Sequence, residues 1–158
     1  MNISMKSFFA SLFFILLLPV NAQAFEELKI LLKETKAPAG VVIEITSGDP
    51  LYLEKIIPEV RADIALLQKK FNKLPVAIVS HARESLILAT KSTDEHKELH
   101  NQIKDLSDKT NTTIHVCGTY ASWFNISENE FPEYINVSPA GPVQVDDYVE
   151  LGYIHIEL

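Results

Sequence analysis

The chain has 158 residues and a formal net charge of −7, from 21 acidic and 14 basic residues. An acidic chain without a basic run is a poor match to nucleic acid, because neutralisation of phosphates supplies most of that affinity. It is an equally poor match to anionic lipid surfaces. We therefore expect neither nucleic-acid binding nor docking on a membrane.

The first 24 residues have the pattern of a secretory signal peptide. Lys6 is followed by a nearly continuous apolar run from Phe8 to Leu18, then by Pro19 and by Ala22-Gln23-Ala24, a small–x–small cleavage pattern. The alternative is a membrane anchor, but the apolar run is shorter than the roughly 20 residues that a spanning helix needs. We predict a signal peptide at residues 1–24 and a single exported domain at residues 25–158, periplasmic or secreted and without membrane insertion after cleavage.

Removal of this segment leaves 134 residues and, because Lys6 is the charge lost, a net charge of −8. That length fits one domain of about 100–150 residues. Cys117 is the single cysteine of the chain, so an internal disulfide is excluded.

Helical and strand patterns alternate along the expected domain. Helical spacing is present at Phe25–Lys36, from Pro50 through Phe71, at Glu84–Thr90, from a Thr93 cap to Lys109, at Tyr120–Phe124, from Ser127, and from residues 139–142 through Leu151. Strand patterns are present at Val41–Ile45, Pro75–Val79, Thr113–Val116, Tyr134–Val137 and Tyr153–Ile156. This alternation predicts an α/β fold in which a mostly parallel five-stranded sheet carries helices on both faces. Strand order does not follow from the sequence.

In such sheets, sites form beyond the carboxyl ends of the strands. The residues at these ends are Thr46, Ser47 and Gly48, then His81, then Cys117 with Gly118, and Pro139-Ala140-Gly141. We take these ends as the candidate site, with Thr46, Ser47, Gly48 and Gly118 lining it.

Cys117 follows the third predicted strand and precedes a predicted helix start, where the N–H groups and dipole favour a thiolate. Gly118 is expected to let the backbone turn sharply and to leave the sulfur unshielded. A buried, inert thiol remains the alternative, because free cysteine is among the most buried residue types.

Two histidines are candidate helpers of this thiol. His115 precedes it by two residues, on the same strand face, and is either a base or a polar residue packed under a helix. His81 ends another strand at the same edge and reaches the thiol only for some strand orders. No spacing among these three residues supports a metal site, and we predict no metal and no cofactor.

These features together resemble the DsrE/DsrF-like family of sulfur-relay proteins, in its single-domain branch. The matching segments are VVIEITSGDP at Val41–Pro50, Val79-Ser80-His81, Ile114–Gly118, Val137–Gly141 and Gly152–Ile156. The resemblance implies a three-layer α/β/α domain that forms homo-oligomers. It also implies a persulfide-bearing cysteine after the third strand, a position that Cys117 matches.

The leading hypothesis is therefore a periplasmic protein in which Cys117 carries sulfane sulfur, with His81 and His115 as electrostatic helpers. The sulfur donor and acceptor are not given by the sequence. Two alternatives remain open: an oligomeric binding module with a buried cysteine, and a redox sensor that forms an interchain disulfide or a sulfenic acid.

Overall fold

The computed structural model describes residues 20–158. Residues 1–19, most of the predicted signal peptide, lie outside the described residues. Within the described part, no helix has the length and apolar character needed to cross a membrane.

Five parallel strands form one sheet with the order β4-β3-β2-β1-β5. The strands are β1 (Gly40–Ile45), β2 (Val76–Ser80), β3 (Thr112–Cys117), β4 (Asn136–Ser138) and β5 (Tyr153–Glu157). The helices are α1 (Val20–Leu31), α2 (Tyr52–Lys70), α3 (Lys97–Lys109), α4 (Gly118–Ser122) and α5 (Gly141–Glu150), and the 3-10 turns are η1 (Arg83–Leu88), η2 (Thr90–Ser92) and η3 (Glu128–Glu130).

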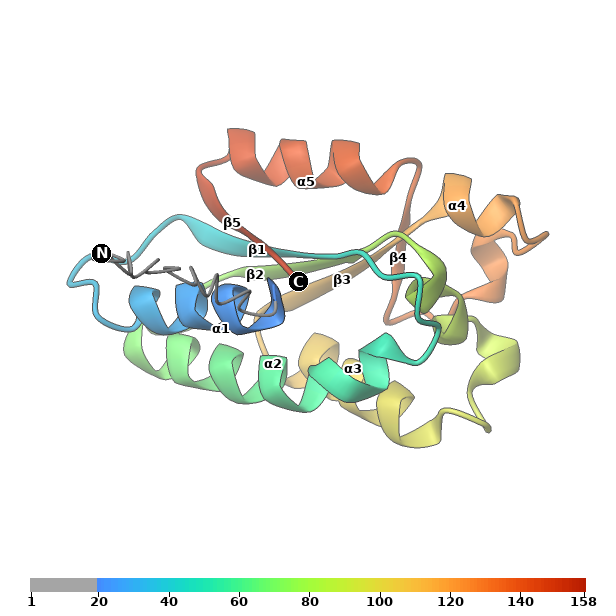
Figure 1. Cartoon of the computed structure of the whole chain (residues 1–158), viewed down its shortest axis with the longest axis horizontal. Helices are drawn as coiled ribbons and strands as arrows, with labels where there is room; N and C mark the ends of the chain where they lie inside the picture. Colours follow the sequence, from blue (N-terminus) through green and yellow to red (C-terminus); the bar gives the residue numbers. More distant parts are fainter. Residues whose placement is uncertain (1–19) are drawn as a thin grey trace, which may run out of the picture.

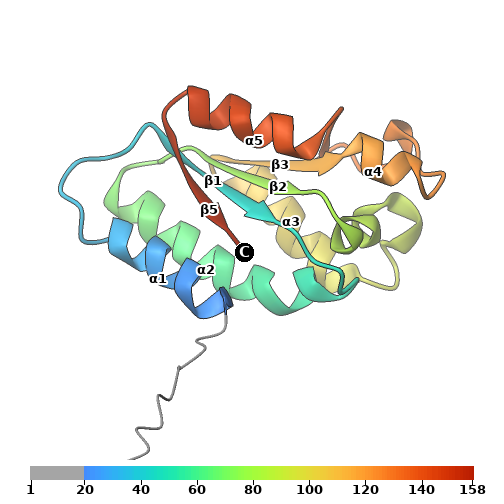
Figure 2. The ribbon, with the colours of Figure 1, turned by 45° about the horizontal axis from the view of Figure 1, so that its top comes forward.

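The direction of the crossovers places the helices in two layers. From β1 to β4 each strand is added on the same side of its predecessor, whereas the chain then returns past β1 to add β5. Because crossovers between parallel strands are right-handed, a reversal of direction moves the connecting helix to the opposite face of the sheet. Accordingly α1, α2 and α3 cover one face and α5 covers the other (Figures 1 and 2). The expected three-layer α/β/α fold is confirmed.

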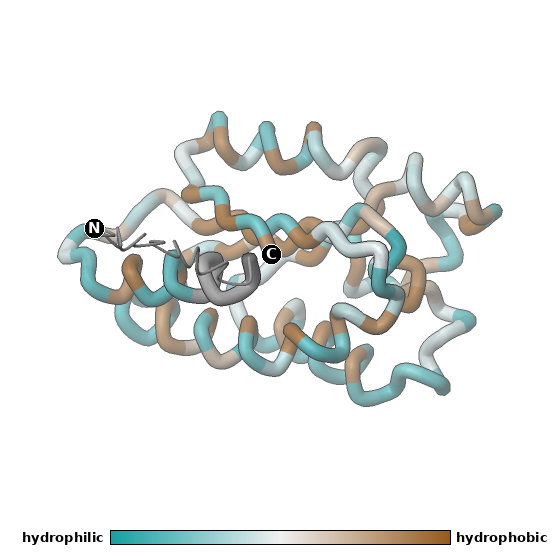
Figure 3. Tube along the Cα trace, in the orientation of Figure 1, coloured by the Kyte–Doolittle hydropathy of each residue, from teal (hydrophilic) through white to brown (hydrophobic). Residues whose placement is uncertain are grey.

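The core is divided unequally between the two faces. The larger cluster packs strand residues such as Ile43, Ile78 and Ile114 against α1, α2 and α3. The smaller cluster lies under α5 and consists of Val42, Ala77, Val79 and Val145. The strands run as a brown, hydrophobic layer through the middle of the molecule (Figure 3), as expected of strands that are covered on both faces.

Several predicted boundaries differ from the structure, mainly in helices. The first helix ends at Leu31 and not at Lys36. Thr93 does not cap α3, which begins at Lys97 after His96, because residues 90–92 form a separate 3-10 turn. The predicted helix at Glu84–Thr90 is the 3-10 segment η1, and the fourth strand is displaced to Asn136–Ser138.

Candidate functional site

The candidate site lies at the carboxyl edge of the sheet, where the loops after β1, β2, β3 and β4 come together. The parallel registers place Ile45 beside Ser80, Ser80 beside Val116, and Cys117 beside Ser138. The residues that follow these positions therefore meet at one edge.

Cys117 ends β3 and is the N-cap residue of α4. Its Sγ atom accepts a hydrogen bond from the Tyr120 N–H at 3.3 Å. The residue is 6% exposed, so the expectation that Gly118 leaves the sulfur unshielded is wrong. The role of Gly118 is one of packing: a Cβ atom there would lie 3.0 Å from Val137 Cγ1 and 3.3 Å from the Ser138 carbonyl oxygen.

His115 is packed under α5 and both of its ring nitrogens are engaged. Nδ1 lies 2.9 Å from Ser138 Oγ, and Nε2 lies 2.9 Å from the Tyr148 hydroxyl. Ser138 Oγ donates its proton to Gln144 Oε1, so His115 Nδ1–H donates to Ser138 and Nε2 accepts from Tyr148. Burial lowers the pKa of His115 below its ordinary value, which favours this neutral form. Within residues 20–158, His115 forms no hydrogen bond with Cys117.

His81 is held from two sides. Its Nε2 atom lies 2.5 Å from Glu44 Oε1 and 3.2 Å from Thr46 Oγ1. Gly141, the first residue of α5, touches its other side: a Cβ atom on Gly141 would lie 2.3 Å from His81 Cβ. Only glycine therefore permits α5 to begin against this imidazole.

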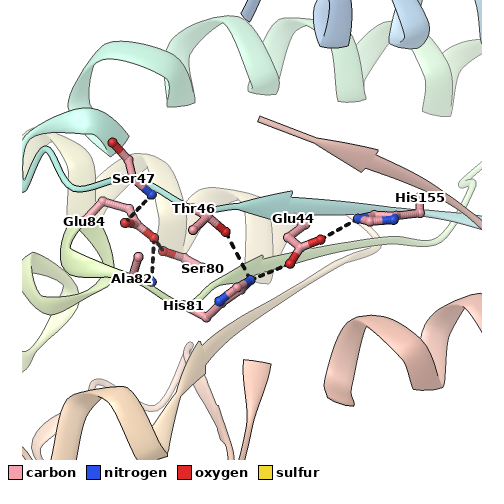
Figure 4. Close-up of polar contacts among 8 residues, drawn as sticks. All are labelled: Glu44, Thr46, Ser47, Ser80, His81, Ala82, Glu84 and His155. Carbon is pink, nitrogen blue, oxygen red and sulfur yellow. Dashed lines mark hydrogen bonds and ion pairs between the residues drawn. The ribbon is translucent and has the colours of Figure 1, made fainter. Parts of the chain in front are cut away.

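Glu44 links His81 to a second histidine. Its Oε2 atom lies 2.6 Å from His155 Nε2, so one carboxylate from the central strand β1 bridges imidazoles from β2 and β5 (Figure 4). The sequence analysis missed both Glu44 and this role of His155. A signal was present, because Glu44 is the one charged residue in the otherwise apolar strand.

Glu84 is a second carboxylate that the sequence analysis missed. It is completely buried, and it accepts hydrogen bonds from Ser47 N–H, Ser80 O–H and Ala82 N–H at 2.9, 2.8 and 3.1 Å (Figure 4). Ser80 is the last residue of β2, whereas Ser47 and Ala82 lie in the segments after β1 and β2, so Glu84 joins two loops of the site. No local sequence pattern marks it.

The remaining predicted lining residues have different surroundings. Thr46 contacts His81, and Ser47 contacts Glu84 while its Oγ accepts the Asp49 N–H. Gly48 borders open space, where a Cβ atom would have no neighbour within 4 Å. The structure thus places Thr46 in the group around Glu44 and His81, places Ser47 in a separate group around Glu84, and leaves Gly48 outside both.

Across residues 20–158, no group of three or more His, Cys, Asp or Glu residues is arranged to hold a metal ion. A surface hollow of about 670 Å³ opens beside β4, with Phe131, Ile135 and Val137 among its lining residues. It includes neither Cys117 nor His81.

No family model and no curated protein sequence matches the chain. Its structure is similar to that of a protein of unknown function from Methanobacterium thermoautotrophicum, with a TM-score of 0.58 and 15% sequence identity. The match covers 75% of this chain and 97% of the other. At this identity the likeness concerns the fold alone.

Proposed function

We propose that this protein is an exported sulfur carrier that accepts sulfane sulfur on Cys117. The observation that supports it best is the position of the thiol, whose Sγ caps α4 and accepts the Tyr120 N–H at 3.3 Å. N–H groups at a helix start stabilise a thiolate, which is the nucleophilic form of cysteine. The resemblance to the DsrE/DsrF-like family supports the same residue.

The reaction is an exchange of sulfur–sulfur bonds. The Cys117 thiolate attacks a terminal sulfur of a polysulfide, a new S–S bond forms, and the attacked S–S bond breaks, with its electron pair leaving on the shortened polysulfide. An acceptor thiolate then attacks the outer sulfur of the persulfide, and Cys117 leaves as a thiolate. Each step exchanges one S–S bond for another, so no further oxidant is needed.

Export and self-association belong to the same proposal. Export rests on the signal-peptide pattern of residues 1–24, and homo-oligomer formation rests on the family resemblance. The polysulfide donor and the thiol acceptor are identified only by these chemical classes.

A binding module with an inert cysteine is the second candidate, and the 6% exposure of Cys117 favours it. The two functions differ in what the native thiol does. A carrier thiol reacts with a small reagent in the folded protein, whereas an inert thiol reacts only after denaturation.

Cyanide release of sulfane sulfur as thiocyanate tests the proposal. After exposure to polysulfide and desalting, wild-type protein should release about one thiocyanate per chain, and Cys117→Ser should release none. Wild-type protein treated with a reductant before cyanide is the control and should also release none. Equal release from wild type and Cys117→Ser would refute the proposal.

A further inference from the structure

Of the two candidate histidines, His81 is the one with a nitrogen available to take a proton. His115 uses both ring nitrogens in its contacts with Ser138 and Tyr148. His81 uses Nε2 alone, and within residues 20–158 its Nδ1 atom forms no hydrogen bond and is not buried.

Glu44 determines which nitrogen of His81 is available. An ionised carboxylate only accepts hydrogen bonds, so the contact of 2.5 Å between Glu44 Oε1 and His81 Nε2 requires the proton to be on Nε2. Nδ1 is then the unprotonated, basic nitrogen. Thr46 Oγ1, at 3.2 Å from Nε2, is a second acceptor for the same N–H.

The sheet register brings His81 beside Cys117. Ser80 of β2 is paired with Val116 of β3, so His81 and Cys117 are the next residues on two neighbouring parallel strands. Both lie on the face covered by α5: His81 touches Gly141, and His115, two residues before Cys117, touches Tyr148.

The segment that leads into α5 connects the same two residues. Cys117 is paired with Ser138, and Gly141 packs on His81. Three residues of chain span at most about 10 Å, so His81 and Cys117 occupy neighbouring backbone positions at one edge of the sheet. Within residues 20–158 no hydrogen bond joins the His81 ring to Cys117 Sγ, so the ring has to approach the thiol for a proton to pass between them.

Few other charges face His81. The carboxylate of Glu84, from η1, accepts hydrogen bonds from Ser80 at the end of β2 and from two backbone N–H groups of the adjoining loops. His155, from β5, faces the second oxygen of Glu44. The first turns of α4 and α5 contain no acidic residue. Glu44 is therefore the carboxylate in contact with His81.

We propose that His81 is the base that removes the thiol proton of Cys117. In this proposal Glu44 positions the His81 imidazole and stabilises its positively charged form. The inference rests on the proposed function and deepens it. The proton moves from Sγ to His81 Nδ1, while Nε2–H remains bonded to Glu44. The products are a thiolate and an imidazolium, which is flanked by the Glu44 carboxylate.

The rate at which iodoacetamide alkylates Cys117, measured against pH in the full chain, tests this step. Glu44→Gln keeps the shape and an acceptor oxygen but removes the charge, and His81→Gln removes the base. In both variants the rate at pH 7 should fall roughly tenfold, the factor that corresponds to a displacement of the rate profile by one pH unit. The plateau at high pH should stay unchanged, because access to the thiol is unaltered.

Glu54→Gln is the matched control, because Glu54 forms a comparable pair with His96, at 2.7 Å. It should leave the profile unchanged. A lower plateau in the site variants, or wild-type profiles in both folded variants, would overturn the inference. If circular dichroism shows that Glu44→Gln does not fold, the alkylation profile of His81→Gln alone decides the outcome.

Polysulfide uptake separates this inference from the function on which it rests. If wild-type protein takes up no sulfur but its alkylation profile depends on Glu44 and His81, the carrier function fails and the base assignment stands. If sulfur uptake is normal and both variants keep the wild-type profile, the base assignment alone fails. A native thiol that is not alkylated at any pH contradicts both.

Discussion

At the scale of single residues, the site is built from polar groups that are paired although they are buried. Polar and charged groups lose hydration on burial, and they are tolerated where hydrogen bonds replace the lost water. Glu84 meets this requirement with three donors, and His115 meets it with two partners. Replacement of one such group leaves its partners buried and unsatisfied, which is the larger part of the cost.

Glu84→Gln should destabilise the protein by about 2–3 kcal/mol. The amide has one acceptor oxygen, so its NH₂ group must face a donor, either Ser47 N–H or the pair formed by Ser80 and Ala82. Urea unfolding followed by circular dichroism measures the loss. The exposed Glu54 is the control, and a Glu84→Gln loss no larger than that of Glu54→Gln would show that the loops do not depend on the carboxylate.

His115 should make stability depend on pH below neutrality. Because burial lowers its pKa in the folded state, the folded protein binds this proton less readily than the unfolded chain does. The stabilisation is complete at pH values above 6.5, the ordinary pKa of histidine. It is lost as the pH falls below 6.5 towards the lower pKa that His115 has in the folded protein. Burial lowers the pKa of His100 as well, so its contribution has the same sign.

His115→Gln tests this dependence. At pH 7 it should lose about 1–2 kcal/mol of stability, because Gln does not reproduce both hydrogen bonds. Between pH 7 and pH 5 its stability should fall less than that of wild type, because the contribution of His115 is absent whereas that of His100 is retained. Urea titrations at several pH values give both slopes. Parallel curves for wild type and His115→Gln would contradict the account.

At the scale of elements, strands are easier to predict from this sequence than helix ends. Three short runs rich in β-branched residues predict β1, β2 and β3 to within one or two residues, because burial on both faces leaves these strands mostly apolar. Helix ends depend on local turns: the 3-10 segment before α3 replaces the Thr93 cap. The exposed polar residues there are compatible with a helix capped by Thr93 and with a separate 3-10 turn, so the sequence pattern does not distinguish these two structures.

Asp63 of α2, in the larger helical layer, is a buried acidic group in unfavourable surroundings. The residue is 6% exposed, and within residues 20–158 its Oδ2 atom has no hydrogen-bond partner. Burial first, and then the charge of Glu59, raise the pKa of Asp63, whereas Lys29 of α1 opposes this effect. The folded state therefore favours the protonated carboxyl, and the stability that this group contributes is lost as pH rises through its folded pKa.

Asp63→Asn should therefore stabilise the protein at pH 7, by an amount on the order of 1 kcal/mol. The gain should shrink as pH falls towards 4, where the wild-type carboxyl becomes protonated. Thermal unfolding at both pH values measures the difference. A variant that is less stable than wild type at pH 7 would show that the Asp63 charge is compensated in the folded protein.

At the scale of the whole molecule, the strand order determines which residues become neighbours at the site. The edge positions of Thr46, Ser47, His81 and Cys117 could be predicted because parallel strands end at the same edge. The contact between Glu44 and His155 could not, since it joins residues that are 111 positions apart and depends on β5 lying next to β1. His115 shows the same limit: its position on the strand was predictable, but its partners on β4 and α5 were not.

The most direct test of the account is intact-protein mass spectrometry of the purified protein before and after brief exposure to polysulfide, with Cys117→Ser alongside. Wild type should gain the mass of one sulfur atom, a reductant should reverse the gain, and the variant should gain nothing. A native wild-type protein without any gain, whose thiol reacts only after denaturation, would contradict the account and would identify Cys117 as a structural residue.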